Sequence, residues 1–344
     1  RVGFAAGLAG FLSRFIPGYH AQNRAPRRRG RPVPCANLER METPIIHTRG
    51  LTKTYGKTDV VHDLNLEVQP GVVHGLLGPN GSGKSTTMKM LLGLIAPTGG
   101  EITMLGQPIT RANRAKVLSG VGSLIEAPAA YPHLTGGENM RVVTRLLGVD
   151  EERARRAVRL VRLENHMDKL VKNYSLGMKQ RLGIAMALAR DPQLLILDEP
   201  TNGLDPAGIE EIRELIISLA RDHGRTVLVS SHLLSEIEKM ATDLTIINHG
   251  ELVFQGSQDE LYSAQLPDVF IQTPHPDAAA EVLRALHPTF VDGGLQLSGL
   301  SDAQVAETCA HLVSHGVPLH QVVRKRRTLE DVFIGLTGKE AMGA

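Results

Sequence analysis

Apolar runs alternate with helical patterns along the middle of the chain, as expected for a parallel sheet covered by helices. Three runs, at residues 72–78, 193–200 and 226–231, are mostly apolar and end in glycine or polar residues, which is typical of buried parallel strands. Residues 207–224 instead repeat apolar side chains on one helical face and stop at Gly224. This part of the chain is therefore predicted to be an α/β domain.

The segments around these runs predict other elements. Residues 45–68 alternate short apolar stretches with polar turns and indicate antiparallel strands. Residues 111–190 are predicted to be mainly helical, and one helix opens with a capping box formed by Thr135 and Glu138. Residues 244–257 indicate a β-hairpin that closes the domain.

The sequence changes in character after residue 256. Ser257 and Glu260 form a second capping box, and a loose alternation of short strands and helices follows. The last helix is predicted to begin at Thr328. We interpret residues 263–344 as a small α+β accessory domain, with a role in either structural support or regulation.

Composition narrows the classes of protein that this chain can represent. Hydrophobic residues make up 42% and charged residues 22% of its 344 residues, values that suit a globular protein with a sizeable core. There is no Trp and only 3% aromatic residues, so the core must be aliphatic. The sequence contains no run of about 18 apolar residues and so predicts no membrane span. Two cysteines are too few for a disulfide framework or a zinc site, which favours a reducing compartment.

The net charge of +2 hides an uneven distribution. Residues 1–40 contain eight of the 38 basic residues and only one of the 36 acidic ones, so the remainder carries a net charge of −5. Because residues 41–344 are acidic overall, they give no reason to expect nucleic acid as a partner. The basic extension could be a translated region upstream of a start at Met41, a targeting peptide, or a tail that touches lipid. We favour the first interpretation, in which residues 1–40 are not part of the native folded sequence.

The strand at 72–78 leads into a glycine-rich loop, GPNGSGKST, that opens a helix. Strand, loop and helix in this order are the context in which this pattern binds the phosphates of a nucleotide. Backbone N–H groups and the helix N-terminus attract the anion, Lys84 neutralises the β- and γ-phosphates, and the Ser85 hydroxyl can bind Mg²⁺. The alternative is a glycine-rich turn capped by Ser85. The expected ATP-binding residues of the loop are Gly78, Asn80, Gly81, Ser82, Gly83, Lys84, Ser85 and Thr86.

Polar side chains follow two of the other buried strands. Asp198 and Glu199 come at the carboxyl end of the 193–200 strand, where ligands bind in open α/β sheets. Asp198 would hold Mg²⁺, and Glu199 would orient or deprotonate an attacking water. Alone, this pair is usually a polar turn, but with the glycine-rich loop it indicates a nucleoside triphosphatase.

His232 follows the 226–231 strand at the same predicted sheet edge. It could contact the γ-phosphate or orient the water, although a histidine in this position is more often a capping or core residue. Asp205 and Pro206 form a helix start with an N-cap and a proline at the first position. For Asp205, any further role would be added to this capping role.

From about residue 45 to residue 257, the chain resembles the ATP-binding subunits of ABC transporters. The motifs that carry this resemblance are GPNGSGKST, YSLGMKQR, LLILDEPTNGLDP and SSHLL, in the order and spacing of that family. Within the family, the chain is similar to subunits that serve drug export and lantibiotic or bacitracin resistance. The resemblance implies a phosphate-loop core with a mostly parallel sheet and helices on both faces, an antiparallel β subdomain and a helical subdomain at about 127–190.

The resemblance also implies partners and further site residues. Tyr55 would stack on adenine, the alternative being a strand aromatic that packs on the core. Two copies would close head to tail on ATP, with Ser175 and Gly177 of one copy facing the phosphates bound by the other. Asp205 would belong to the loop that links the two sites. Residues 127–170 would contact a separate transmembrane permease and so hold the subunit at the cytoplasmic face of the membrane.

Two positions depart from the usual pattern of the family. The signature is Leu-Ser-Gly-Gly-Gln in most members, whereas this chain has Tyr-Ser-Leu-Gly-Met and keeps only Ser175 and Gly177 of the central residues. Glu126 stands where most members have a Gln that touches Mg²⁺ and the water. A carboxylate binds a hard cation well but cannot donate a hydrogen bond unless it is protonated. The same replacement is a feature of the lantibiotic-protection subunits.

Three functions follow from these residues. The favoured one is an ATP-hydrolysing subunit that energises an exporter. A second is a soluble ABC-type ATPase that acts on nucleic acid or ribosomes, but such proteins carry two ATP modules or long coiled coils that this chain lacks. A third is a nucleotide-binding protein without hydrolysis, which the presence of Glu199 and His232 argues against.

Overall fold

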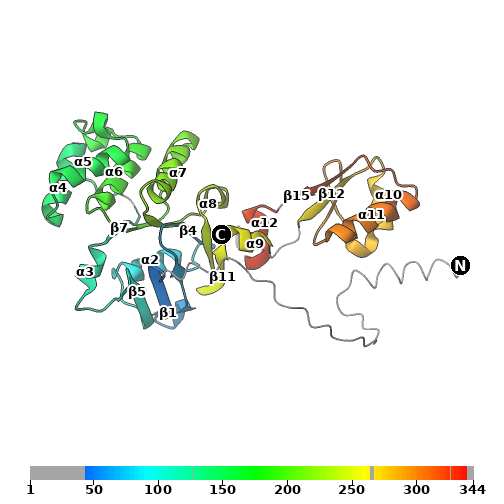
Figure 1. Cartoon of the computed structure of the whole chain (residues 1–344), viewed down its shortest axis with the longest axis horizontal. Coiled ribbons are helices and arrows are strands. Elements are labelled where there is room, and N and C mark those ends of the chain that lie inside the picture. The colour runs from blue at the N-terminus through cyan, green and yellow to red at the C-terminus, as the bar shows by residue number, and fades with distance from the viewer. Residues whose placement is uncertain (1–42, 127, 264–266, 326, 339–344) are drawn as a thin grey trace, which may run out of the picture. The chain divides into compact units, whose positions relative to one another are not determined.

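The computed structural model describes residues 43–126, 128–263, 267–325 and 327–338, and these residues form two units (Figure 1). The larger unit combines the described residues of Glu42–Leu261 with those from Thr328 onward, and the smaller unit comprises the described residues of Tyr262–Arg327. The chain thus leaves the larger unit, forms the smaller one and returns.

A six-stranded sheet lies at the centre of the larger unit, with the strand order β11-β10-β4-β9-β8-β7. The five strands from β10 to β7 are parallel, and only β11 is antiparallel. Every residue of β4, β8 and β9 is buried, which explains their nearly continuous apolar sequence. The bounds are β4 Val73–Leu77, β7 Val121–Leu124, β8 Leu194–Leu197, β9 Thr226–Ser230, β10 Asp243–Asn248 and β11 Glu251–Ser257.

A second, antiparallel sheet precedes and flanks this core. Its strands run in the order β2-β1-β5-β6, and β3 also pairs with β1. The bounds are β1 Ile46–Tyr55, β2 Thr58–Leu64, β3 Glu67–Val68, β5 Gly99–Met104 and β6 Gln107–Pro108. Buried aliphatic side chains from both sheets, among them Ile46, Leu64, Leu76 and Leu228, share one hydrophobic cluster. The two sheets are therefore parts of one core, as the predicted fold class requires.

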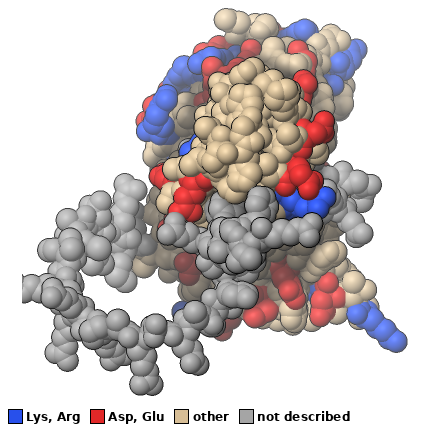
Figure 2. All heavy atoms as spheres, turned by 90° about the vertical axis from the view of Figure 1, so that its right-hand side faces the viewer, with Lys and Arg blue, Asp and Glu red and all other residues tan. Residues whose placement is uncertain are grey.

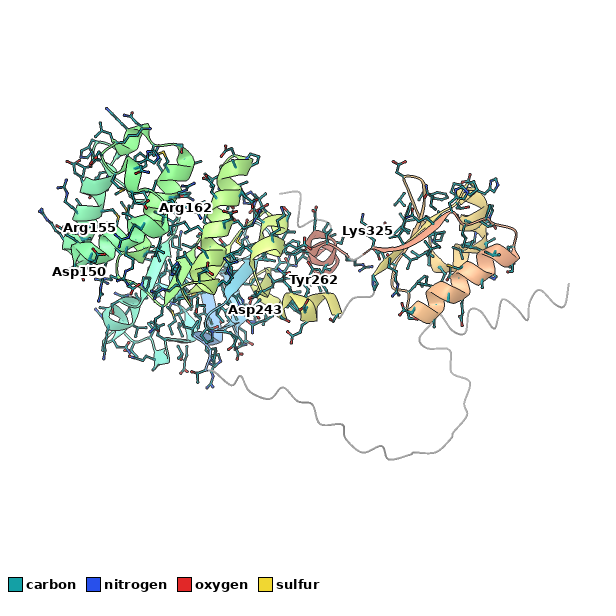
Figure 3. The ribbon with its side chains drawn as sticks, turned by 45° about the horizontal axis from the view of Figure 1, so that its top comes forward. Asp150, Arg155, Arg162, Asp243, Tyr262 and Lys325 are labelled. Atoms are coloured by element: carbon teal, nitrogen blue, oxygen red, sulfur yellow. The ribbon has the colours of Figure 1, made fainter. Side chains whose placement is uncertain are left out.

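Helices cover the parallel sheet and form a separate helical layer. Helices α7 and α8 pack against β9 and β4, while α3 and α6 pack against β7. Helix α4 begins with the predicted capping box, in which Glu138 N–H donates to Thr135 Oγ1 and Thr135 N–H donates to Glu138 Oε2. Asp150, labelled in Figure 3, caps α5 by accepting from Arg153 N–H. The helices of this unit are α2 Lys84–Leu91, α3 Arg114–Leu118, α4 Gly136–Leu147, α5 Glu151–Leu160, α6 Leu176–Leu188, α7 Pro206–Arg221 and α8 Leu234–Met240, with single 3₁₀ turns at Glu164–His166 and Val171–Asn173.

The last helix, α12 (Leu329–Thr337), belongs to the larger unit and not to the accessory domain in which the sequence analysis placed it. It begins at Thr328 as predicted, with a capping box formed by Thr328 and Asp331. Leu329, Val332 and Phe333 are buried, and Leu329 N–H donates to Glu238 Oε1 of α8 (3.3 Å). The helix packs against α8 because its apolar face is buried there, a choice of partner that its sequence pattern does not specify.

The smaller unit is an antiparallel sheet with two helices. Its elements follow in the order β12, α10, β13, β14, α11, β15, and the sheet has the strand order β13-β14-β12-β15, a split βαβ arrangement. Figure 2 shows mainly uncharged side chains on the near surface of this unit. The bounds are β12 Asp268–Gln272, α10 Pro276–Val282, a 3₁₀ turn Arg284–Leu286, β13 Thr289–Val291, β14 Gly294–Leu297, α11 Asp302–Ser314 and β15 Gln321–Lys325, with α9 Gln258–Ser263 at the junction.

Three short strands were not predicted. Strand β6 follows β5, β7 lies inside the segment that was expected to be mainly helical, and β13 lies in the smaller unit. All three are edge strands of two to four residues, too short for an alternating pattern to be recognised. Strand β7 matters for the site because Glu126 follows it.

None of the helices in the described part of the chain is long and apolar enough to cross a membrane.

The buried core of the larger unit contains a histidine that can ionise. His74 on β4 is 2% exposed, and its Nε2 lies 2.8 Å from Thr245 Oγ1. Burial lowers the pKa of His74 from 6.5 to about 3, because a charged imidazolium would lose its hydration.

We expect acid to destabilise the protein through His74. The unfolded chain binds this proton near pH 6.5 and the folded chain only near pH 3, so stability is complete above pH 6.5 and falls as the pH decreases toward 3. Between pH 6.5 and 5 this group should account for about 2 kcal/mol. Denaturant unfolding at pH 6.5 and pH 5 should show a smaller loss of unfolding free energy in His74→Gln than in wild type. The control is His223→Gln, which changes an exposed histidine and should lose as much as wild type. An equal loss in all three proteins would contradict this prediction.

Candidate functional site

The glycine-rich loop connects β4 to α2, and close packing at Gly78 and a positive φ at Gly83 favour glycine at these positions. A Cβ atom on Gly78 would lie 2.3 Å from both Ile247 O and Ser82 Oγ. Gly83 has a φ of 103° and serves as the N-cap of α2, a conformation that L side chains rarely adopt. The loop can therefore place its backbone N–H groups and the start of α2 around an anion.

Lys84 lies inside this loop. Its side chain is buried, and its Nζ donates to Gly78 O (2.7 Å) and Pro79 O (3.0 Å). Burial lowers the pKa of Lys84, while the charges of Glu199 and Asp198 raise it and oppose that effect. A bound phosphate would add a further negative partner for this partly desolvated ammonium.

Asp198 and Glu199 follow β8, and Ser230 at the end of β9 connects them. The Ser230 hydroxyl donates to Asp198 Oδ1 (2.6 Å), and Glu199 N–H donates to Ser230 Oγ (3.0 Å). The backbone of Glu199 has a φ of 50°, an uncommon conformation for a residue other than glycine that is often found at functional sites. No role was predicted for Ser230 from the sequence, although it is the first residue of the SSHLL motif and the last residue of β9.

His232 and Glu199 contact each other directly. His232 Nδ1 lies 2.5 Å from Glu199 Oε2, and His232 N–H donates to the same oxygen (3.3 Å). If Glu199 is ionised it can only accept, so Nδ1 carries the hydrogen and Nε2 remains available for another group. Helix α8 follows His232 and is tied to α7 by the ion pair between Arg213 and Glu236 (2.7 Å).

Loop residues 80–86 and the side chains of Glu199 and His232 line one cavity of about 480 Å³. Gly78 and Asp198, which were predicted with them, are not among the residues that line it. Val60 and Asn202 also line it and were not predicted. Asn202 stands in the LLILDEPTNGLDP motif but was given no role, whereas Val60 stands in no motif. The full lining is Val60, Asn80, Gly81, Ser82, Gly83, Lys84, Ser85, Thr86, Glu199, Asn202 and His232.

Tyr55 lies at the end of β1 and is 50% exposed. The alternative that this ring packs in the core is therefore wrong. The Lys53 ammonium lies 4.9 Å from the ring centroid, within the range of a cation–π interaction. Tyr55 is not among the residues that line the cavity, so its role with adenine stays a prediction.

Glu126 lies beyond the end of β7, and its side chain points to α2. Lys89 Nζ donates to Glu126 Oε1 (2.8 Å), and this hydrogen bond lowers the pKa of Glu126. The exposed position of Glu126 leaves it accessible to a ligand. Its predicted role as a ligand of Mg²⁺ stays a prediction.

Ser175, Gly177 and Asp205 line a second cavity of about 610 Å³, whose lining shares no residue with the first. Ser175 is the N-cap of α6 and accepts from Met178 N–H (3.2 Å). Asp205 is the N-cap of α7, accepts from Gly208 N–H (3.1 Å) and is followed by Pro206 at the first helical position. The predicted capping role of Asp205 is thus confirmed. One chain therefore presents the two groups of predicted ATP-binding residues at separate places.

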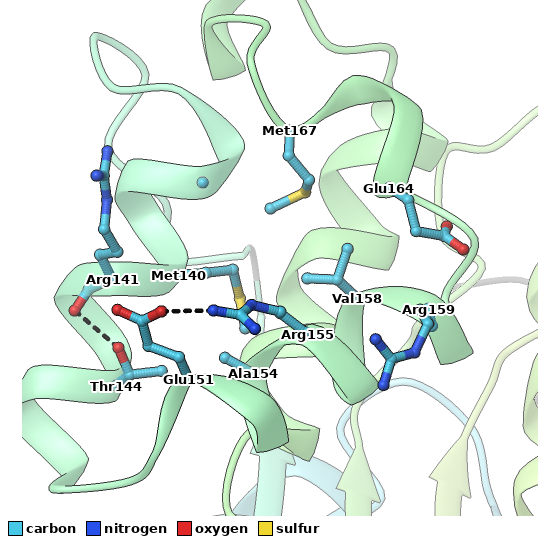
Figure 4. A pocket seen from close by; sticks show the side chains of 11 residues that line it. Met140, Arg141, Thr144, Glu151, Ala154, Arg155, Val158, Arg159, Glu164 and Met167 are labelled. Carbon is cyan, nitrogen blue, oxygen red and sulfur yellow. Dashed lines mark hydrogen bonds and ion pairs between the residues drawn. The ribbon is translucent and has the colours of Figure 1, made fainter.

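A third cavity, of about 480 Å³, lies between α4 and α5 (Figure 4). Apolar side chains of Met140, Ala154, Val158 and Met167 line it together with charged side chains at its border. Arg155 at this border donates to Glu151 (2.8 Å).

Comparisons with known proteins agree with the resemblance seen in the motifs. Residues 61–202 match the ABC transporter family. The bacitracin transport ATP-binding protein BcrA of Enterococcus faecalis is 39% identical over 299 residues, which cover 86% of this chain and 96% of that protein. The lantibiotic transport ATP-binding protein SrtF of Streptococcus pyogenes is 43% identical over 228 residues, covering 64% of this chain and 97% of that protein.

The fold agrees with solved structures as well. A dimeric structure of MJ0796, a bacterial ABC transporter cassette, superposes with a TM-score of 0.56 at 26% identity and covers 62% of this chain and 98% of that one. The predicted fold class is therefore confirmed. On this evidence, the chain belongs to the family of ABC transporter ATP-binding proteins, the ATPase subunits that energise transport.

Proposed function

We propose that two copies of this chain close head to tail on two ATP molecules and drive the export of an antimicrobial peptide, antibiotic or drug through a separate permease. The observation that supports this proposal most directly is the division of the predicted ATP-binding residues between two cavities of one chain. A second copy would bring Ser175 and Gly177 to the phosphates held by the first copy's loop.

In this proposal, Glu199 acts on the water that attacks the γ-phosphate. Its carboxylate would accept a proton from the water or orient it, and Lys84 would stabilise the negative charge that develops on the phosphate oxygens. His232 would hold Glu199 through Nδ1 and present Nε2 toward the γ-phosphate. The direct contact between His232 and Glu199 supports this division of roles.

The oxygen donors at this site suit Mg²⁺. The Ser85 hydroxyl and the carboxylates of Asp198 and Glu126 are hard ligands of the kind that this ion prefers, and phosphate oxygens would complete its shell. When bound, Mg²⁺ would neutralise charge on the β- and γ-phosphates. Ser230 would keep Asp198 oriented through its hydrogen bond.

Binding to the permease would hold this subunit at the cytoplasmic face of the membrane. The cavity between α4 and α5 has an apolar floor and charged residues at its border, a surface that suits a short amphipathic segment of a permease. It lies within residues 127–170, the part predicted to meet the membrane partner.

We expect Arg155→Glu to weaken co-purification of the permease by about tenfold, because it reverses a charge at the border of this cavity. Arg145→Glu reverses an exposed charge on the same helical subdomain but outside the cavity, and should have little effect. Both variants should keep the ATPase activity of the isolated chain. Equal retention of the permease by both variants would rule out this contact.

The export function itself is tested in cells. Co-expression of this chain with the membrane protein that co-purifies with it should raise resistance to bacitracin or to a lantibiotic, the compounds transported by its named relatives. The Lys84→Ala variant, which cannot stabilise the phosphates, is the control and should give no resistance. If the co-expressing cells tolerate neither class of compound better than the Lys84→Ala control does, the proposed class of transported compound is wrong.

A further inference from the structure

Lys89 lies one helical turn beyond Ser85 on α2, on the same side of the helix as this predicted magnesium ligand. Its Nζ donates to Glu126 Oε1 (2.8 Å). The pKa of Lys89 is raised, first by this hydrogen bond and also by the charges of Glu126, Asp198 and Tyr55. One ammonium group thus binds one of the two carboxylates that we assign to Mg²⁺ and feels the charge of the other.

The Glu126 side chain is mostly exposed to solvent. Glu126 has a φ of 63°, an uncommon conformation for this residue type, and its side chain is 71% exposed. A side chain with so few neighbours samples several rotamers unless a polar partner holds it. In this structure Lys89 provides that partner and directs the carboxylate toward α2.

The charges around the proposed metal site indicate how the pair of Lys89 and Glu126 would affect metal binding. Asp198 and Glu199 already supply two negative charges, and Glu126 adds a third where most of the family carries a neutral Gln. The ammonium of Lys89 offsets this added charge and occupies an oxygen that could otherwise bind a cation. In the proposed site, Mg²⁺ would therefore compete with Lys89 for this oxygen of Glu126.

We propose that Lys89 is a positioning residue for Glu126 and that their hydrogen bond sets the Mg²⁺ concentration at which the site binds Mg²⁺ with nucleotide. This inference rests on the proposed role of Glu126 as a ligand of the metal. Lys89 itself does not touch the reacting atoms.

The test is a Mg²⁺ titration of the full chain with a fluorescent ATP analogue, which reports binding and not turnover. Lys89→Met should lower the half-saturating Mg²⁺ concentration by about two- to fivefold, the range expected for an exposed ion pair. Lys89→Arg should keep the wild-type value, because arginine also pairs with a carboxylate. Lys172→Met removes an exposed lysine elsewhere and is the matched control. Binding of the analogue in EDTA shows that each variant is folded.

Glu126→Gln separates this proposal from the proposed function on which it rests. Glu126→Gln should raise the half-saturating Mg²⁺ concentration, and adding Lys89→Met to it should produce little further change. A shift in Glu126→Gln with none in Lys89→Met would overturn the role of Lys89 and leave that of Glu126 intact. If neither variant shifts the titration, Glu126 is not a ligand of Mg²⁺ and both proposals fail.

Discussion

The Glu199→Gln variant should bind ATP and dimerise on it but lose steady-state hydrolysis by about 10²- to 10³-fold. The amide keeps the size of the side chain and a contact with His232, but it cannot accept a proton from the attacking water, and general bases contribute about 10²–10⁴-fold. ATP should therefore remain bound in a closed dimer. Phosphate release measures the loss of turnover, and size-exclusion chromatography with ATP measures the dimer.

Two further variants make this result specific. Glu210→Gln changes an exposed carboxylate on α7 that pairs with Arg213, and it should hydrolyse ATP at nearly the wild-type rate. His232→Ala removes the group that contacts Glu199, and it should slow hydrolysis without trapping the dimer as tightly. Undiminished steady-state hydrolysis in Glu199→Gln would show that this carboxylate is not the base.

The same contact connects the site to distant parts of its unit. His232 directly precedes Leu233, the N-cap of α8, and α8 is held by Arg213 of α7 and by the buried face of α12. Helix α7 in turn begins at Asp205, beside the second cavity. Two packed helices, α7 and α8, thus connect Asp205 to His232.

Much of the larger unit could be predicted because local sequence determines it. Strands β4, β8 and β9 are buried on both faces and so are apolar throughout, and the capping boxes at Thr135, Ser257 and Thr328 depend on residues three positions apart. The phosphate loop could be predicted for the same reason, since its spacing is local.

Partners that lie far apart in the sequence could not be predicted. The pairing of Lys89 with Glu126 joins residues 37 positions apart, and that of Ser230 with Asp198 joins residues 32 positions apart. Likewise, the apolar face of α12 indicated a helix but did not reveal that α8 covers it. Tertiary packing decides such contacts, and a pattern within one segment carries no information on them.

Replacing Gly177 with alanine should leave the fold intact but impair function. A Cβ atom there would have only Leu204 Cδ2 within reach, at 4.0 Å, so packing within the chain does not require glycine. Alanine is the better helix former, and Gly177→Ala should raise the free energy of unfolding by about 0.5 kcal/mol. In the proposed dimer the added methyl group would face the partner's phosphates, and ATP-dependent dimerisation and hydrolysis should fall by about tenfold or more.

Gly183, on the same helix α6, provides the opposite case. A Cβ atom there would lie 3.0 Å from both Leu124 Cδ1 and Pro128 Cβ, and Gly183→Ala should therefore destabilise the chain by about 1–3 kcal/mol. Denaturant unfolding and ATP-dependent dimerisation, measured on both variants, separate the two roles. If Gly177→Ala dimerises and hydrolyses ATP like the wild type, the small residue at this position does not serve a ligand held by a second copy, and the head-to-tail arrangement loses its main support at the signature helix.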